Sequence, residues 1–311
     1  MQNKKHEHLF IVYNPNSTGA ATVEEQVFDP LDEQGIRYEV YDTKSPDTEE
    51  NIADMQQIPS DADVIVAAGD GTAMQITNAA QRGKKDWTIG FTPHGNFSDQ
   101  AYTHASHQHD VLDLLNAPTV DVAPMTIEVD GEYWRHAPSY MTIGWSAIAA
   151  SQFGDHESRD VMKNTPKALK LARSLAQLAE NYYKNRKTFL PPFAVNGDNQ
   201  DNMTDIMAVN GPRVAGIIRS QDTYYDKPYF GAKADIDVSH ILPNIPFGLK
   251  ALSGHTPLER VESMNIAFEE AARIPVQTEG EFQWLDAQNI YVYKNPNDRL
   301  QIRHPKRTAR A

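Results

Sequence analysis

The chain has 311 residues, which at roughly 150 residues per domain suggests two domains. Acidic residues outnumber basic ones by 42 to 29, and this balance argues against a nucleic-acid-binding protein with a basic surface. The absence of cysteine excludes disulfides, thiolate metal sites and cysteine nucleophiles. The first apolar run, Leu9–Tyr13, is too short for a signal peptide, and no uncharged stretch approaches the ~18 residues of a membrane span. We expect a soluble, cytoplasmic protein that contacts a membrane, if at all, only from outside.

The first part of the chain, residues 6–121, alternates strand and helix patterns. We expect strands at 9–13, 37–41, 63–68 and 87–91, separated by helices at 20–34, 48–57 and 72–81. Pro30 should break or kink the first helix. Strands that alternate with helices of this length form βαβ units, so a parallel sheet is predicted.

Residues 122–303 have a different, β-rich pattern. Strand-like runs are found at 126–129, 133–136, 139–143, 206–209, 214–218, 234–238 and 290–293. Asp130-Gly131 predicts a tight hairpin turn between the first two. One long amphipathic helix is expected at Pro166–Asn185. We interpret this part as a β-sandwich-like second domain, followed by a basic, frayed tail at residues 304–311.

Polar, glycine-containing loops follow three of the predicted parallel strands at their carboxyl ends, where open α/β sheets bind ligands. In the first loop, Ser17 and Thr18 stand before a helix and could seat a phosphate, although an ordinary helix cap explains them as well. The second loop, Gly69-Asp-Gly-Thr72, opens a helix directly after a buried strand. Its Asp70 suits a phosphate site only if Mg²⁺ or hydrogen-bond donors intervene; a tight turn with an Asp cap is the alternative. The third loop spans Thr92–Asp99.

Together these loops resemble the diacylglycerol and sphingosine kinase superfamily, in its bacterial form. The resemblance rests on Asn14-Pro-Asn-Ser-Thr-Gly19, Ala68-Gly-Asp-Gly-Thr72 and Pro93-His-Gly-Asn-Phe-Ser-Asp99, with a late Gln277-Thr-Glu-Gly-Glu281 similar to the family's Gln-x-Asp-Gly-Glu. It implies a Rossmann-like nucleotide domain followed by a β-sandwich-like lipid domain. It also implies ATP and Mg²⁺ as cofactors and a lipid or amphiphile as substrate.

Carried over residue by residue, the resemblance assigns nucleotide binding to Asn14, Asn16, Ser17, Thr18, Gly19, Thr43, Ala68, Gly69, Gly71, Thr72, Gly95 and Asn96. Asp70 would organise the glycine loop and the Mg²⁺ shell. Glu279 would be the general base that takes the proton from the lipid hydroxyl. Glu281 would share its side of an extended segment and orient it or help to hold Mg²⁺. An acidic surface turn is the plainer interpretation of this motif.

The sequence also departs from the family pattern. Ala68 replaces a glycine, Asn96-Phe97-Ser98 replaces Thr-x-Asn, and Glu279 replaces an aspartate. The leading hypothesis is an ATP-dependent kinase of diacylglycerol or a related amphiphile. The departures at Asn96–Ser98 and Glu279 favour a second hypothesis, a nucleotide-binding regulatory protein with weak or lost turnover. A third is a kinase for a soluble substrate, as in the related NAD kinases.

Two further clusters favour structural roles. His104, His107 and His109 have a spacing that fits a solvated helix end better than a metal site, and no metal ligands are assigned. Tyr224, Tyr225 and Phe230 are interpreted as packing in the second domain rather than as a lipid clamp. The literal Asp130-Gly-Glu132 is interpreted as the hairpin turn, not as the catalytic motif.

Overall fold

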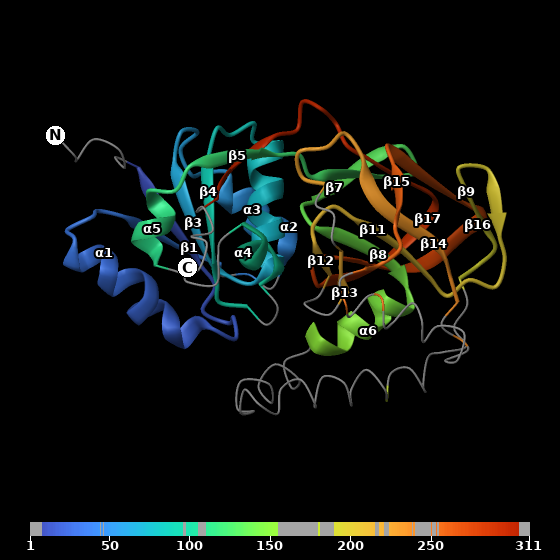
Figure 1. Cartoon of the computed structure of the whole chain (residues 1–311), viewed down its shortest axis with the longest axis horizontal. Helices are drawn as coiled ribbons and strands as arrows, with labels where there is room; N and C mark the ends of the chain where they lie inside the picture. Colours follow the sequence, from blue (N-terminus) through green and yellow to red (C-terminus); the bar gives the residue numbers. More distant parts are fainter. Residues whose placement is uncertain are drawn as a thin grey trace. The chain divides into compact units, whose positions relative to one another are not determined.

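The computed structural model describes residues 8–43, 45, 47–95, 98–104, 110–154, 180, 190–214, 218–220, 224–237, 239, 250, 253 and 255–304. The chain divides into two compact units (Figure 1). Unit 1 comprises Met1–Pro124 and Pro296–Ala311, and unit 2 comprises Met125–Asn295. Unit 2 is therefore inserted into unit 1 between two of its segments.

Unit 1 contains a six-stranded sheet in the order β2-β1-β3-β4-β18-β5. The strands are β1 (Leu9–Tyr13), β2 (Glu39–Asp42), β3 (Asp63–Ala68), β4 (Thr88–Pro93), β5 (Thr119–Val122) and β18 (Leu300–Arg303). All neighbours run parallel except β18 and β5. The predicted parallel sheet and Rossmann-like fold class are confirmed, and the four strands expected in this region form within two residues of their predicted ends.

Helices cover both faces of this sheet (Figure 1). They are η1 (Ala20–Thr22), η2 (Glu24–Phe28), α1 (Asp29–Glu33), α2 (Thr48–Met55), α3 (Asp70–Arg82), α4 (Asp99–His104) and α5 (Val111–Leu115). The segment predicted as one helix over 20–34 changes from 3₁₀ to π to α geometry, and Pro30 lies in the first turn of α1. Pro30 thus lies where the segment changes from π to α geometry, and its missing N–H accounts for an interruption of the hydrogen-bond ladder there. Val27 and Leu31 of this segment pack with Ile11 and Ile65 of the sheet.

The last strand of unit 1 departs from the predicted division of the chain. Residues 296–303 were expected in the second domain, but β18 pairs with both β4 and β5. Arg303 fastens the strand, since its guanidinium forms a salt bridge with Asp63 and donates to the carbonyl oxygens of Leu115 and Ala117. The sequence did not predict this strand because four residues, Leu300–Arg303, are too few to show an alternation of apolar and polar side chains. Their partners also lie far away in the sequence.

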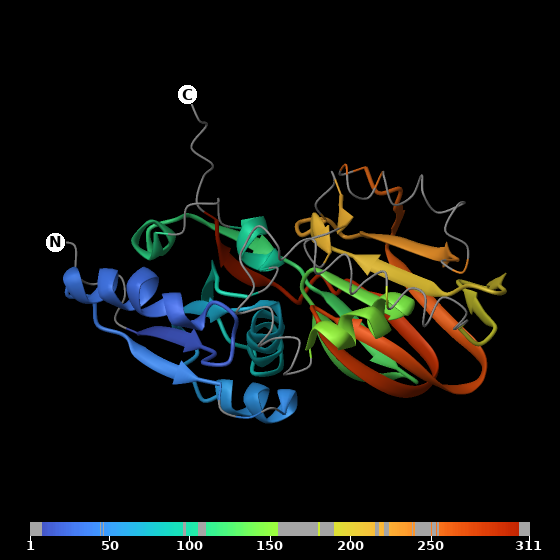
Figure 2. The ribbon, with the colours of Figure 1, turned by 90° about the horizontal axis from the view of Figure 1, so that it is seen from below.

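Unit 2 contains a ten-stranded sheet in which every pairing is antiparallel. Its strands are β6 (Met125–Val129), β7 (Glu132–Ala137), β8 (Tyr140–Gly144), β9 (Phe193–Val195), β10 (Asp198–Gln200), β11 (Asp205–Val209), β14 (Phe230–Ile236), β15 (Glu259–Val261), β16 (Ser263–Thr278) and β17 (Glu281–Tyr293). The long β16 and β17, orange and red in Figure 2, bend along their length. The sheet thus curls into the predicted sandwich-like form around a core that includes Ile143, Ile206, Ile266 and Ile290.

The predicted hairpin at Asp130-Gly131 is present. Both residues have positive φ, 51° and 83°, which is the backbone of a two-residue hairpin turn. The Asp130 carboxylate accepts hydrogen bonds from the N–H groups of Gln288 and Asn289. The literal Asp-Gly-Glu of residues 130–132 therefore belongs to the sheet.

The strand expected at 214–218 is instead a two-stranded pair, β12 (Arg213–Val214) and β13 (Ile218–Arg219). A short helix, α6 (Trp145–Gly154), follows β8. The long helix expected at Pro166–Asn185 lies outside the described residues apart from Glu180, and residues 305–311 of the expected tail also lie outside them. In the part of the chain that the structure describes, no helix has the length and apolarity needed to cross a membrane.

Candidate functional site

The strand order of unit 1 creates a place for a ligand. From β1 the chain crosses to β2 on one side and later enters β3 on the other side, so β1 and β3 are neighbours that follow opposite crossovers. At such a switch point the loops after the two strands diverge and leave a crevice at their carboxyl ends. The loops that begin at Asn14 and at Gly69 are therefore the ones that flank the crevice.

Glycines bring the three loops of this edge into backbone contact. The N–H of Gly19 donates to the carbonyl oxygen of His94 over 2.9 Å, and a Cβ on Gly19 would lie 2.6 Å from the His94 Cα. A Cβ on Gly95 would lie 2.4 Å from the Cα of Gly69. Side chains do not fit at such distances, so the contacts between the loops require glycine at position 19 in the first loop and at position 95 in the third. The three loops form one backbone-built surface.

The first loop is a turn that its own polar groups close. The N–H of Ser17 donates to the Asn14 carbonyl over 3.0 Å, and the Asn14 Oδ1 accepts from the N–H of Asn16 over 2.9 Å. The Oγ of Ser17 is buried and has no hydrogen-bond partner among the described residues. A buried hydroxyl without a partner is costly to fold around, and a phosphate oxygen would satisfy it. Thr18 is partly exposed beside it.

The second loop leads directly into α3. Gly69 is its N-cap and supplies no side chain, and Asp70 is the first helical residue. The predicted Asp cap is therefore not formed. Instead the Asp70 Oδ1 accepts from the N–H of Gln100 in α4 over 3.1 Å, which ties the second loop to the third. Thr72 is buried, and its Oγ1 accepts a hydrogen bond from Asn14 over 3.4 Å, which ties the second loop to the first.

The remaining predicted nucleotide positions lie at the same strand ends. Thr43 is buried directly after β2, and its N–H donates to the Tyr13 carbonyl over 2.9 Å. Ala68 ends β3 and is buried, so its methyl group replaces the family's glycine inside the sheet. Asn96 lies outside the described residues, and Ser98 closes the third loop by accepting from the Gly95 N–H over 2.9 Å.

These residues fit a phosphate group. The first N–H groups of α3, at Asp70, Gly71 and Thr72, have no intrahelical acceptor, and the helix dipole favours an anion at that end. These N–H groups lie at the same edge of the sheet as the Ser17 hydroxyl and the backbone of the glycine loops. Among the described residues, no group of three or more His, Asp or Glu side chains could hold a metal ion. Mg²⁺ would thus be bound mainly through phosphate oxygens, which is its usual mode with nucleotides.

The acidic motif of unit 2 lies in the turn between β16 and β17. Glu279 and Gly280 have φ values of 51° and 86° and form a two-residue hairpin loop, closed by the pair Thr278–Glu281. Glu279 is only 1% exposed. Its Oε1 accepts from the N–H of Ser139 and from the N–H of Tyr140, the latter over 2.7 Å. The alternative interpretation as an acidic surface turn is therefore wrong: the turn is buried, and its carboxylate is fixed on the start of β8.

The turn geometry corrects one premise about Glu281. An extended segment would have placed Glu279 and Glu281 on one side, but the left-handed backbone at residues 279 and 280 reverses the chain between them. Glu281 begins β17 and is partly exposed. Two carboxylates of different environment therefore stand at this turn, one anchored and one accessible.

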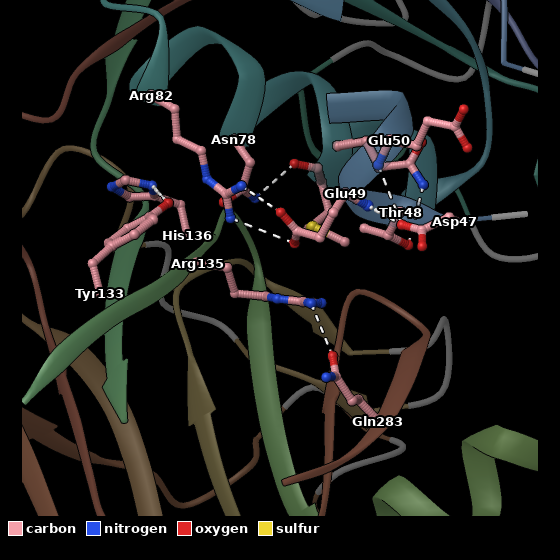
Figure 3. Close-up of polar contacts among 12 residues, drawn as sticks. Asp47, Thr48, Glu49, Glu50, Asn78, Arg82, Tyr133, Arg135, His136 and Gln283 are labelled. Carbon is pink, nitrogen blue, oxygen red and sulfur yellow. Dashed lines mark hydrogen bonds and ion pairs between the residues drawn. The ribbon is translucent and has the colours of Figure 1, made fainter. Parts of the chain in front are cut away.

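Polar side chains surround the turn within unit 2. Gln277 donates to the Tyr140 hydroxyl and accepts from Thr142, each over 3.2 Å. The buried Arg135 donates to Thr278 over 3.3 Å and to Gln283 over 3.1 Å, the second contact being drawn in Figure 3. Arg135 also stacks 4.0 Å from the Trp134 ring. These contacts hold the strands on both sides of the turn in register.

Several residues around these sites escaped the sequence analysis. Gln100 connects the second loop of unit 1 to the third, and Ser139 and Asn210 support the acidic turn of unit 2. A buried polar residue just after a buried strand, as Asn210 is after β11, is the only signal that could have drawn attention to them.

The histidine cluster is only partly described. His107 and His109 lie outside the described residues. His104 does not form a solvated helix end, because it is buried between Phe91 and His304. Burial, with a smaller contribution from His304, lowers the pKa of His104 to about 3. The expectation that Tyr224, Tyr225 and Phe230 pack inside the second domain agrees with their burial.

Comparisons with known proteins find similarity to diacylglycerol kinases. Residues 8–124 match the sequence model of the diacylglycerol kinase catalytic domain. A search of curated protein sequences finds no significant match to the chain. The fold resembles the crystal structure of a diacylglycerol kinase from Bacillus anthracis str. Sterne, with a TM-score of 0.67, 17% identity and 98% of each chain covered. A second structure from that organism, provisionally described as a diacylglycerol kinase, gives a TM-score of 0.66 at 18% identity, covering 97% of this chain and 98% of its own. At such identities the likeness establishes the fold.

Proposed function

We propose that the protein transfers the γ-phosphoryl group of ATP to a hydroxyl of diacylglycerol or a related amphiphile, because residues 8–124 match the sequence model of the diacylglycerol kinase catalytic domain. The observation that carries the proposal is the surface built by three loops of unit 1, which glycines bring into backbone contact at the switch point of the sheet. A cytoplasmic location with peripheral membrane contact is part of the proposal, because such a substrate resides in membranes.

Unit 1 would bind the nucleotide. Ser17, Thr18 and the N–H groups of residues 69–72 would contact the phosphates, with Asn14, Asn16, Gly19, Thr43, Ala68, Gly95 and Asn96 completing the site. When bound, Mg²⁺-ATP supplies the phosphoryl group and neutralises the charge that develops on it. Asp70, fixed by Gln100, would hold the second loop against the third and face the cation.

Unit 2 would accept the proton of the attacking hydroxyl. A hydroxyl is a poor nucleophile at neutral pH, and a positioned carboxylate typically contributes about 10²–10⁴-fold to such a step. We propose that this carboxylate belongs to the turn of residues 279–281. Glu279 is the base expected from the sequence. Its Oε1, however, already accepts two N–H bonds from Ser139 and Tyr140, so this oxygen is held away from an attacking hydroxyl. Glu281 is the alternative base, with Glu279 then orienting the turn.

The test is transfer of the γ-phosphate from radiolabelled ATP to a panel of lipids in mixed micelles. Diacylglycerol, monoacylglycerol and sphingoid bases are compared with glycerol and NAD without detergent, and ATP binding is measured in parallel by calorimetry. Labelled lipid supports the proposal. Labelled NAD in the absence of lipid would instead select the soluble-substrate kinase.

A second candidate function is a nucleotide-binding protein with weak or lost turnover. It is favoured by the buried, doubly hydrogen-bonded carboxylate of Glu279 and by the sequence substitutions at Asn96–Ser98 and Glu279. ATP binding without transfer to any acceptor would establish this function in place of the first.

A further inference from the structure

Asn210 is a buried hub between three segments of unit 2. It follows β11 and is fully buried. Its N–H donates to the Ser139 carbonyl over 2.6 Å, and its carbonyl accepts from the Tyr224 N–H over 2.9 Å. Its side chain donates to the Pro138 carbonyl and accepts from the Lys294 ammonium, each over 2.8 Å. The backbone and side-chain polar groups of Asn210 are thus all hydrogen-bonded. Two of their partners, Pro138 and Lys294, lie 72 and 84 residues away from Asn210 in the sequence.

Lys294 is the second element of the hub. It directly follows β17 and is 9% exposed, which is rare for lysine. Besides Asn210, its ammonium donates to the carbonyl oxygens of Tyr224 and Tyr225, the latter at 3.5 Å. Burying an ammonium is costly unless oxygens surround it. The Lys294 ammonium is therefore stable in this place only because the oxygens of Asn210, Tyr224 and Tyr225 accept its hydrogen bonds.

The hub lies beside the connection between β7 and β8, two strands that follow each other in the chain but are not neighbours in the sheet. Tyr293 pairs with Thr126 of β6, and the neighbouring Met125 pairs with Ala137, the last residue of β7. On the other side, Val209 of β11 pairs with Tyr140 of β8. The short connection of residues 138–139 joins β7 to β8. Asn210 holds this connection through Pro138 and Ser139, and Lys294 in turn holds Asn210.

The same connection holds the acidic turn. The Glu279 carboxylate accepts from the N–H groups of Ser139 and Tyr140, and Thr278 pairs with Met141. The Ser139 hydroxyl also lies 3.2 Å from the hydroxyl of Tyr225. A continuous series of hydrogen bonds therefore runs from Lys294 through Asn210 and Ser139 to Glu279.

We propose that Asn210 and Lys294 are positioning residues for the turn of residues 279–281: they fix the backbone donors that hold Glu279 and thereby set the direction of the reactive carboxylate. This inference rests on the proposed kinase function. A misplacement of reacting groups by about 1 Å can cost as much as ~100-fold in rate, so a device that fixes a turn matters to the rate even without touching substrate.

The experiment uses the full chain and three hub variants. Lys294→Met removes the charge with little change of shape, Lys294→Arg retains the charge, and Asn210→Asp removes the donor to Pro138 while keeping an acceptor for Lys294. Lys227→Met is the control, because Lys227 is an exposed lysine of the same unit that pairs with Asp226. The fraction of folded protein in each sample is taken from near-ultraviolet circular dichroism and thermal unfolding, which report on both units.

We expect Lys294→Met and Asn210→Asp to lower kcat at least about 10-fold per folded molecule, with the KM for ATP unchanged. Lys294→Arg should recover part of the loss, and the control should match the wild type. Hydrogen exchange should accelerate at the N–H groups of Ser139 and Tyr140 in the two impaired variants. Unchanged kcat and exchange in Lys294→Met would overturn the inference, as would a loss of kcat that follows the folded fraction alone.

The exchange measurement separates this inference from the proposed function. If the wild type phosphorylates no lipid, the kinase proposal fails. Faster exchange at Ser139 and Tyr140 in Lys294→Met would still show that the hub fixes the turn, and unchanged exchange would show that it does not.

Discussion

The two units build their candidate sites by different means. In unit 1 the backbone itself makes the surface, because Gly19 and Gly95 let three loops approach to distances that exclude side chains. In unit 2 long-range side-chain contacts from Asn210 and Lys294 hold the connection on which a buried carboxylate rests. A site made of backbone leaves a local mark in the sequence, since only glycine satisfies it. A site made by a distant side-chain network leaves no such mark.

The largest effect is expected at Asp70, where the backbone site of unit 1 depends on one carboxylate. Asp70→Asn keeps an acceptor for the Gln100 N–H but removes the charge that suits a cation at the phosphates. We expect turnover to fall at least ~10³-fold, the scale of losing one key electrostatic group, at unchanged melting temperature. Asp86→Asn, an exposed acid of the same unit, is the matched control. Full activity in Asp70→Asn would remove the residue from the site.

The acidic turn gives the next largest effect and tests how unit 2 contributes. Glu279→Gln retains an oxygen for the two N–H donors and loses the negative charge. If Glu279 is the base, transfer should slow at least ~100-fold without weaker ATP binding. Glu281→Gln is the paired variant. A loss in Glu281→Gln alone would assign proton acceptance to Glu281 and leave Glu279 the role of anchor. A faster Glu279→Asp enzyme would show that the longer side chain costs activity.

Gly95→Ala tests the backbone contact directly. The new Cβ would lie 2.4 Å from the Gly69 Cα, so one of the loops must move. Overpacking of this kind typically costs about 1–3 kcal/mol of unfolding free energy. We expect a lower melting temperature and ATP binding weakened by about 10-fold, both seen by calorimetry.

The control for this variant is Gly35→Asn. Gly35 also lies in unit 1, with a φ of 64° and no heavy atom within 4 Å of an added Cβ. Asparagine tolerates that backbone conformation, so stability and ATP binding should change little. If Gly95→Ala behaves like Gly35→Asn, the loops do not need their close contact.

The strands also differ in how well the sequence predicts them. The strands at Leu9–Tyr13 and Asp63–Ala68 were predictable because short apolar runs between polar loops are typical of strands buried on both faces. The long β16 was missed over most of its length. Its alternation is interrupted near Glu269 and Glu270, where the register with β17 shifts between Ala267 and Ala272. The bulge that bends the strand also hides it from a period-two pattern.

The two candidate sites also differ in how far the sequence predicts them. The loop residues of unit 1 were predicted together because parallel strands place their carboxyl ends on one edge. The burial of Glu279 was not predicted, since its partners Ser139 and Tyr140 come from a strand 140 and 139 residues earlier. Local sequence carries no information on such a pairing.

The two units should also respond to pH in opposite directions. Burial raises the pKa of Asp205 in unit 2 from 3.8 to about 8, against weaker opposing hydrogen bonds from Ser146. The folded state then binds the proton more tightly than the unfolded state. The contribution is fully present below the unfolded pKa and is lost as the pH rises toward 8. For His104 in unit 1 the lowered pKa means stability that is present above 6.5 and lost as the pH falls toward 3.

Thermal unfolding from pH 4 to pH 9 measures both slopes. Asp205→Asn keeps an acceptor for Ser146 and should flatten the decline on the alkaline side. His104→Gln should flatten the decline on the acid side. Curves that stay parallel to the wild type would show that neither group contributes to the pH dependence.

The smallest effect is expected on the surface of unit 1. Arg82 of α3 pairs with Glu49 of α2 (Figure 3), and the two side chains are 26% and 53% exposed. Solvent screens such a pair, so Glu49→Gln should change the free energy of unfolding by less than about 1 kcal/mol in a urea titration. A larger change would mean that the contact between α2 and α3 is fixed electrostatically rather than by packing.

The position of β18 has a consequence for how the protein is made. The strand supplies the sheet partner of β4 and β5, yet residues 300–303 leave the ribosome only after the whole of unit 2. Until then β4 presents an open edge, and open edges invite pairing with other chains. A nascent chain halted before residue 300 would carry every loop residue of the phosphate surface on a sheet that is still incomplete.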